Sequence, residues 1–263
     1  MNELEDFFLN GSHRLIHKWK HYFDIYERHV PRIRDTRAAA NVRVNMLEIG
    51  ISHGGSLEMW NHYFGGNVNI YAVDINPECK KFETDNIKIF IGSQEDPTFL
   101  RNLKASLPRL DLLIDDGGHT MKQQIVTFEH LYDHIVDDGI YLCEDTHTSY
   151  WKRYGGGLRK KRSFIEYSKN FIDFLNAWHS EQKSLKVSAF TKSVNSLHYY
   201  DSMLFIEKKQ RSKPYAEMTG NASFQDTDDA GKFKKFKRTL WNTFLAVTNK
   251  TLRFFRLGGF VWK

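Results

Sequence analysis

Five side chains that can bind or move charge stand close to the ends of two predicted strands. They are Asp115, Asp116, His119, Glu144 and Asp145. The strands are the apolar runs 110–114 and 140–143, and residues 121–136 between them have apolar positions at helical spacing until Asp-Asp-Gly at 137–139. A strand–helix–strand crossover makes its two strands parallel, with their carboxyl ends at one edge of a sheet. We therefore expect the five side chains to converge.

Four carboxylates at one point repel each other unless protons or a cation compensate their charge. A divalent cation that prefers oxygen ligands, such as Mg²⁺, is the natural occupant. The plain structural alternative is that Asp-Gly-Gly is a turn and Glu-Asp a solvated strand end. Both features stand at the paired ends of one crossover, with a histidine three residues after Asp116, so we favour a functional site.

A glycine-rich turn follows an earlier predicted strand at residues 45–50. It leads into a helix, and the next strand, 68–73, is followed by Asp74. Backbone N–H groups of such a turn can approach a ligand, and the acid can accept both hydroxyls of a ribose. The spacing does not fit the dinucleotide pattern G-x-G-x-x-G. Glu48-x-Gly50-x-x-x-Gly54 instead resembles the S-adenosylmethionine site of class I methyltransferases. A third strand, 87–91, leads to residues 92–97, where adenine would be held.

Length and composition favour one main α/β domain in the cytoplasm. The 263 residues contain no apolar run near the ~20 residues of a membrane span. The first six residues are acidic, unlike a signal peptide. Cys79 and Cys143 have no CxxC neighbour and are expected to be reduced packing residues.

The pattern divides the chain into four parts: a helical cap at 1–41, a core at 42–207, a linker at 208–231 and a basic amphipathic helix at 232–263. Within the cap, residues 3–30 are expected to be helical until Pro31, with a linker at 31–41. A capping box at Ser163–Glu166 predicts a helix to Trp178. Residues 184–190 and 196–206 are expected to form an antiparallel pair of strands.

The net charge of +6 is concentrated in the C-terminal part. Residues 231–263 contain nine Lys or Arg and no acid, which leaves 29 basic against 32 acidic residues before them. The predicted tail helix can lie on an anionic membrane surface, at the inner face of the membrane, or pack on the body or on another subunit, so a homo-oligomer stays open. No nucleic acid partner is expected, because the basic residues are not part of a recognisable nucleic-acid-binding motif.

Together these motifs look like the metal-dependent sugar O-methyltransferases of macrolide biosynthesis, of the mycinamicin and tylosin type, and the cephalosporin hydroxylase-like proteins. The resemblance covers residues 12–206, and its most specific part is Asp-x-x-His followed by Glu-Asp. It implies an α/β, Rossmann-like class I methyltransferase fold, with a mostly parallel seven-stranded sheet, helices on both faces and a C-terminal antiparallel hairpin.

The resemblance also implies roles for single residues. Mg²⁺ would be held by Asp116, Glu144 and Asp145, and His119 would be the general base. S-adenosylmethionine would be bound by Glu48, Gly50, Gly54, Asp74, Gln94 and Asp115. The family's Gly-Asp-Gln stretch is Gly-Ser-Gln here, because Ser93 replaces the Asp.

The expected function is S-adenosylmethionine- and Mg²⁺-dependent O-methylation of a sugar hydroxyl, in a surface polysaccharide or a glycosylated natural product. The basic tail favours a glycan assembled at a membrane. Three alternatives stay open: a catechol or phenol acceptor, an iron oxygenase using His119, Asp145 and His147, and a non-catalytic scaffold. The iron oxygenase is disfavoured because it leaves Glu48, the glycines and Asp74 without a purpose.

Overall fold

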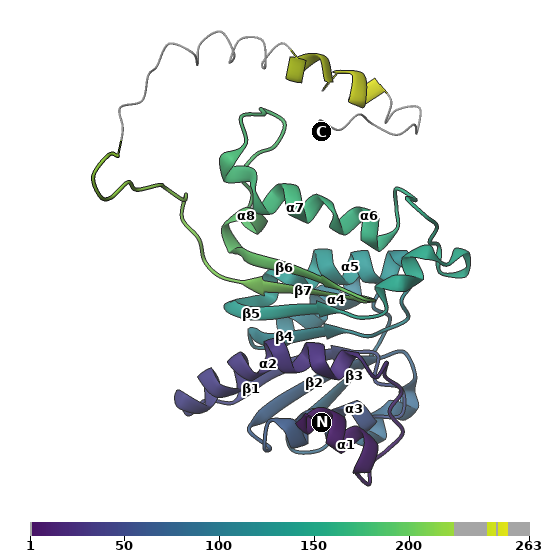
Figure 1. Cartoon of the computed structure of the whole chain (residues 1–263). Coiled ribbons are helices and arrows are strands. Elements are labelled where there is room, and N and C mark those ends of the chain that lie inside the picture. Colours follow the sequence, from purple (N-terminus) through teal and green to yellow (C-terminus); the bar gives the residue numbers. More distant parts are fainter. Residues whose placement is uncertain (1, 224–240, 246, 252–263) are drawn as a thin grey trace. The chain divides into compact units, whose positions relative to one another are not determined.

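The computed structural model describes residues 2–223, 241–245 and 247–251. The chain divides into two compact units, Met1–Pro214 and Tyr215–Lys263. The first unit contains a seven-stranded sheet with the order β3-β2-β1-β4-β5-β7-β6 (Figure 1). Its strands are β1 (Val44–Ile49), β2 (Val68–Asp74), β3 (Ile87–Ile91), β4 (Leu110–Asp115), β5 (Ile135–Cys143), β6 (Val194–Tyr200) and β7 (Met203–Lys208).

The strands β1 to β5 are parallel, and β7 is antiparallel to both β5 and β6. This confirms the predicted mostly parallel α/β sheet with an antiparallel C-terminal pair. The helices are α1 (Glu3–Asn10), α2 (Tyr22–Ala39), α3 (Gly55–Tyr63), α4 (Pro97–Ser106), α5 (Met121–Leu131), α6 (Phe164–Ser168), α7 (Asn170–Leu175) and α8 (Ala189–Ser193). Short 3₁₀ turns are η1 (Pro77–Phe82), η2 (Tyr132–His134), η3 (Thr146–Tyr150), η4 (Lys152–Tyr154) and η5 (Ala177–His179).

Two apolar cores cover the two faces of the sheet. Side chains alternate across a strand, so neighbours such as Met46 and Leu47 of β1 enter different cores. Helices α1, α2 and α3 contribute Leu4, Phe23 and Trp60 to one core. Helices α4 to α7 pack on the other face, through residues such as Leu100, Phe128, Phe164 and Phe171. Parallel strands covered on both faces leave their carboxyl ends as the exposed edge where a site can form.

The N-terminal prediction was wrong in two respects. Residues 3–30 include two helices separated by a segment without regular secondary structure, because Gly11 ends α1. Pro31 does not end α2, which continues to Ala39. Beyond the proline, Ile33 is buried in the core and Arg37 pairs with Asp111, so tertiary contacts maintain the helix that the proline weakens.

Three further boundaries differ from the sequence prediction. Residues 184–190 are not a strand, and both strands of the hairpin lie within 194–208, with a turn that contains Ser202 at φ 66°. Ser188 and Thr191 form a capping box, which makes 189–193 a helix. Strand β5 begins at Ile135 and includes 137–139, because η2 ends the helix early and Ile135 pairs with Leu110. The helix predicted up to Trp178 is divided into α6, α7 and η5.

Part of the predicted tail helix, 232–240, 246 and 252–263, lies outside the described residues. Residues 241–245 and 247–251 are helical, and Trp241, Phe244 and Val247 are exposed. Within the described part of the chain, no helix is both long enough and apolar enough to span a membrane.

Candidate functional site

A cavity of about 520 Å³ lies at the carboxyl edge of the parallel strands. The segments that follow β1, β2, β3, β4 and β5 all contribute to its wall. The extended segment between α1 and α2 adds residues 15–18. The edge that the sequence predicted is therefore the place where the chain forms its cavity, and the N-terminal segment contributes to it as well.

The glycine turn after β1 forms one wall. Gly50 has φ 84°, and a Cβ atom on it would lie 2.2 Å from the backbone oxygen of Asp116, so only glycine fits. Asp74 Oδ2 accepts hydrogen bonds from the backbone N–H groups of Ile51 and Ser52, each at 3.0 Å. Gly54, with φ 75°, lies against Phe82 before α3 and is not part of the cavity wall. The strand-end acid thus holds the turn in place.

Gln94 connects two further parts of the wall. Its amide nitrogen donates to Asp115 at 2.9 Å, and its amide oxygen accepts from the backbone N–H of Gly118 at 2.8 Å. Glu48 and Asp115, which the sequence assigned to cofactor binding, are almost fully buried and do not line the cavity. Burial raises the pKa of both carboxyls to about 7. Both residues are therefore buried beneath the residues that line the cavity.

Asp116, His119 and Asp145 form a group in the lining of the same cavity. Each offers one ligand atom, and the three atoms lie within 4.8 Å of one another. His119 Nε2 is 3.4 Å from Asp145 Oδ2 and 3.9 Å from Asp116 Oδ1. His119 and Asp145 have φ values of 56° and 52°, a conformation that non-glycine residues adopt rarely and often at functional sites.

The environment of His119 favours a neutral imidazole. Burial lowers its pKa, and although Asp145 and Glu144 act in the opposite direction, the pKa remains below 6.5. Among the described residues, its buried Nδ1 atom has no hydrogen-bond partner. The backbone of His119 is held by the Thr148 hydroxyl, which donates to its carbonyl oxygen at 2.9 Å. His119 can therefore accept a proton.

Lys18 is a residue of the candidate site that the sequence reasoning missed. Its ammonium group, with the side chain 2% exposed, lies 2.6 Å from Asp116 Oδ2 and 2.8 Å from Glu144 Oε2. Burial opposes its charge, but the carboxylates outweigh this and raise its pKa. Burial also raises the pKa of Asp116 and Glu144 to about 7, against the effect of Lys18.

Two tyrosines of α2 complete the acid cluster, and these were missed as well. Tyr26 donates to Glu144 Oε1 at 2.6 Å, and Tyr22 donates to Asp145 Oδ1 at 2.7 Å. Both oxygens of Glu144 are thus engaged, and Glu144 is not part of the group formed by Asp116, His119 and Asp145. The aromatic spacing of α2 indicated a docking face, but it could not reveal that two hydroxyls reach the acids.

Aromatic side chains lie next to Asp145 and outside the lining of the cavity. His147 is 3.9 Å from Asp145, and its ring contacts Trp19 and Trp151 at centroid distances of 5.7 and 4.6 Å. The guanidinium of Arg153 lies 4.8 Å from the Trp151 ring. Trp19 and Trp151 are 50% and 40% exposed. In the described part of the chain, the group of three ligands at this site is formed by Asp116, His119 and Asp145 and does not include His147.

The chain resembles characterised enzymes, although no family model matches it. It is 30% identical over 200 residues to the 8-demethyl-8-α-L-rhamnosyl tetracenomycin-C 2'-O-methyltransferase of Streptomyces olivaceus, which covers 73% of this chain and 51% of that enzyme. It is 31% identical over 224 residues to the demethylmacrocin O-methyltransferase of Streptomyces fradiae, covering 81% of this chain and 54% of the enzyme. The chain spans about half the length of the curated relatives it matches.

A solved structure gives the same result. The MycE methyltransferase of the mycinamycin pathway, in complex with Mg and SAH, superimposes with a TM-score of 0.66 and 27% identity. The match covers 79% of this chain and 54% of MycE. A second MycE structure, with Mg, SAH and mycinamycin VI, has a TM-score of 0.61 and covers 74% and 52%. The chain therefore has the class I methyltransferase fold and is a homologue of the sugar O-methyltransferases of macrolide pathways.

Proposed function

We propose that this protein transfers the methyl group of S-adenosylmethionine to a sugar hydroxyl, with Mg²⁺ as the metal. The observation that carries the proposal is one cavity lined by two kinds of group. A glycine turn in its lining is held by a strand-end acid, and a histidine of lowered pKa lies close to two carboxylates. The relatives named above, all O-methyltransferases, support the reaction class.

The donor would lie along the glycine turn. The backbone at Gly50 can approach it closely. Asp74 Oδ2 already accepts two backbone N–H groups, but Oδ1 accepts only one and keeps a lone pair that can accept from a ribose hydroxyl. Gln94 borders the region proposed for adenine. Glu48, Gly54 and Asp115 would act by supporting the wall. The cavity volume lies within the usual range of about 300–1,000 Å³ for small-molecule sites.

Asp116 and Asp145 fit a divalent cation because their oxygens lie close together and Mg²⁺ prefers carboxylate ligands. Glu144 belongs to the proposed ligand set, and it would take part in competition with Lys18 and Tyr26. Bound Mg²⁺ would lower the pKa of an acceptor hydroxyl and orient it.

His119 would take the proton of that hydroxyl. An aliphatic hydroxyl is a very weak acid, so a neutral base within reach is needed in the transition state. The acceptor oxygen forms a bond to the methyl carbon as the carbon–sulfur bond breaks. The products are a methyl ether, S-adenosylhomocysteine and a protonated His119.

The acceptor would lie against the aromatic side chains beside Asp145. Trp19 and Trp151 offer exposed ring faces on which the C–H face of a sugar ring can pack, and Arg153 offers hydrogen-bond donors. The exposed Trp241, Phe244 and Val247 of the C-terminal unit, with the basic residues of the tail, support a glycan at the inner face of a membrane as the acceptor class.

The test has a binding arm and a turnover arm. Calorimetry with S-adenosylhomocysteine, with and without Mg²⁺ or EDTA, measures both ligands. Mass spectrometry then follows the gain of one methylene on nucleotide sugars, rhamnosides and a catechol. We expect EDTA-sensitive methylation of a glycoside by the parent chain, and methylation about 10²- to 10⁴-fold slower by His119→Gln. Methylation of the catechol alone would show that the acceptor is a phenol and not a sugar. If the parent chain binds neither S-adenosylhomocysteine nor Mg²⁺, the protein is a non-catalytic scaffold.

A further inference from the structure

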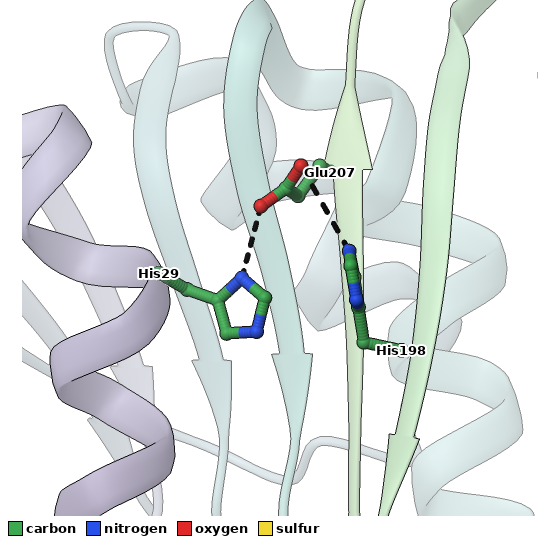
Figure 2. A group of neighbouring side chains, drawn as sticks. All are labelled: His29, His198 and Glu207. Atoms are coloured by element: carbon green, nitrogen blue, oxygen red, sulfur yellow. Dashed lines mark hydrogen bonds and ion pairs between the residues drawn. The ribbon is translucent and has the colours of Figure 1, made fainter.

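A second cluster of metal-type ligands lies outside the cavity. It contains His29 of α2, His198 of β6 and Glu207 of β7, whose side chains point toward one another (Figure 2). Each offers one ligand atom within 4.8 Å of the others. His29 Nδ1 is 2.9 Å from Glu207 Oε1, and His198 Nε2 is 3.9 Å from Glu207 Oε2. None of the three lines the cavity, so the cluster is separate from the proposed catalytic site.

The spacing and chemistry of this cluster suit a transition-metal ion. Zinc bonds to nitrogen and oxygen are about 2.0–2.2 Å long, which places neighbouring ligands of a tetrahedral ion about 3.3 Å apart. The two distances of 2.9 and 3.9 Å lie on either side of that value. Two imidazoles with one carboxylate favour zinc, cobalt or nickel over Mg²⁺, which prefers oxygen ligands only.

The orientation of His29 is fixed as in a metal-bound histidine. His29 is 6% exposed, and its ring stacks on Phe205 at a centroid distance of 4.5 Å. Its other nitrogen, Nε2, is 2.9 Å from the Tyr200 hydroxyl. A hydrogen bond at the nitrogen that faces away from the ion holds ring and tautomer in nearly all histidine metal sites. Nδ1 is thereby left facing Glu207.

The other two ligands, Glu207 and His198, are both within hydrogen-bonding distance of Ser196, and His198 is partly exposed to solvent. The Ser196 hydroxyl donates to Glu207 Oε2 at 3.0 Å and lies 2.9 Å from His198 Nε2. The side chain of His198 is 35% exposed, so water can reach the ion as a fourth ligand. The arrangement thus provides three protein ligands and an accessible fourth position.

We propose that His29, His198 and Glu207 bind a divalent transition-metal ion, with Zn²⁺ as the natural occupant. The ion would join α2 near the N-terminus to the β6–β7 hairpin. Its role would be structural, because the site lies outside the cavity that holds the proposed catalytic residues. The proposal is independent of methyl transfer.

Co²⁺ serves as the probe because its visible absorption reports ligand type and geometry. The full chain with Asp145→Asn is used, so that the carboxylate cluster of the cavity competes less for the metal. We expect one Co²⁺ per chain, with a tetrahedral nitrogen–oxygen spectrum, and stoichiometric displacement by Zn²⁺. His198→Gln and Glu207→Gln, each in this background and each checked for folding by circular dichroism, should lose the spectrum.

Two further variants make the result specific. Tyr200→Phe keeps all three ligands and should weaken Co²⁺ binding about tenfold, because only the orientation of His29 is relaxed. His179→Gln removes an exposed histidine elsewhere and should change nothing. Equal Co²⁺ binding by the Asp145→Asn chain and by the His198→Gln and Glu207→Gln variants made in it would overturn the proposal. So would absence of Co²⁺ from the Asp145→Asn chain, since the three residues would then form only a hydrogen-bonded network.

Discussion

At the scale of single residues, Lys18 changes the electrostatics of the proposed metal site. The sequence predicted that protons or a cation must offset the clustered acids, and a divalent metal was favoured for that role. The structure places a buried ammonium between Asp116 and Glu144. These residues are separated by 98 and 126 positions from Lys18, so no local pattern could reveal the contact. The acids could be predicted because they end adjacent strands.

Replacing Lys18 by Met should destabilise the metal-free protein by about 3–5 kcal/mol near pH 8, because two buried carboxylates lose their partner. The pKa of both carboxyls is already raised to about 7, so protonation relieves the repulsion and the loss should be smaller at pH 5.5. Urea unfolding in the presence of EDTA measures this loss of stability. Lys20→Met is the control: Lys20 is 72% exposed and should contribute less than about 1 kcal/mol. Equal stability of both variants would contradict the role of Lys18.

His119 should set the acid limit of activity. The neutral imidazole accepts the proton, and a pKa lowered by burial keeps it neutral further into the acid range. With saturating Mg²⁺, the fall of kcat on the acid side should therefore have its midpoint below 6.5, the ordinary pKa of a histidine. His119→Gln should lower kcat by about 10²- to 10⁴-fold and keep S-adenosylhomocysteine binding. A rate that already falls above pH 7 would point to another base.

At the scale of elements, periodicity predicted what is locally determined. The strands 87–91 and 110–114 each carry four apolar residues and one charged residue, and β3 and β4 lie there. The end of the helix at Pro31 and the position of the hairpin were predicted wrongly, because both depend on contacts with residues distant in the sequence. Arg37 pairs with Asp111 beyond the proline, and the turn within 194–208 is made by Asp201-Ser202, which carries no glycine as a turn signal.

Gly50 tests how the turn after β1 positions the turn after β4. Gly50→Ala introduces strain of roughly 1–2 kcal/mol at positive φ and also a clash with the Asp116 backbone, at 2.2 Å. Gly66→Ala is a matched control, since Gly66 has φ 72° and nothing within 4 Å of its added Cβ. Both should lose similar intrinsic stability. Only Gly50→Ala should also lower kcat, by about 100-fold, as Asp116 moves. If Gly50→Ala and Gly66→Ala have the same kcat, the turn after β1 does not position the turn after β4.

The 3₁₀ turns after β5 should determine how the acceptor binds. Trp151→Ala removes an exposed ring face beside His147 and should raise KM for a glycoside roughly fivefold, for a loss of about 1 kcal/mol. Binding of S-adenosylhomocysteine and Mg²⁺ should not change. Phe174→Ala, which alters an exposed aromatic residue of α7, should leave KM as it is. A change in donor affinity with Trp151→Ala would place this residue in the donor site.

At the scale of the whole molecule, the sequence predicted the sheet edge because parallel strands end together whatever their side chains are. It did not predict that the segment between α1 and α2 also reaches that edge, since residues 15–18 were included in the helix expected over 3–30. All residues of the candidate site and both apolar cores lie in Met1–Pro214. The nine basic residues at 231–263 lie in the other unit.

This division allows donor binding and surface binding to be tested apart. A chain ended after Pro214 should keep S-adenosylhomocysteine affinity and change its unfolding midpoint by less than about 2 °C. The full chain should sediment with vesicles rich in phosphatidylserine, since each basic residue near an anionic surface contributes about 1 kcal/mol. The shortened chain should stay in solution. Neutral phosphatidylcholine vesicles and added salt are the controls, because screening weakens the attraction. Loss of donor affinity on shortening would make the tail part of the site, and equal sedimentation of both chains would remove the membrane from the proposal.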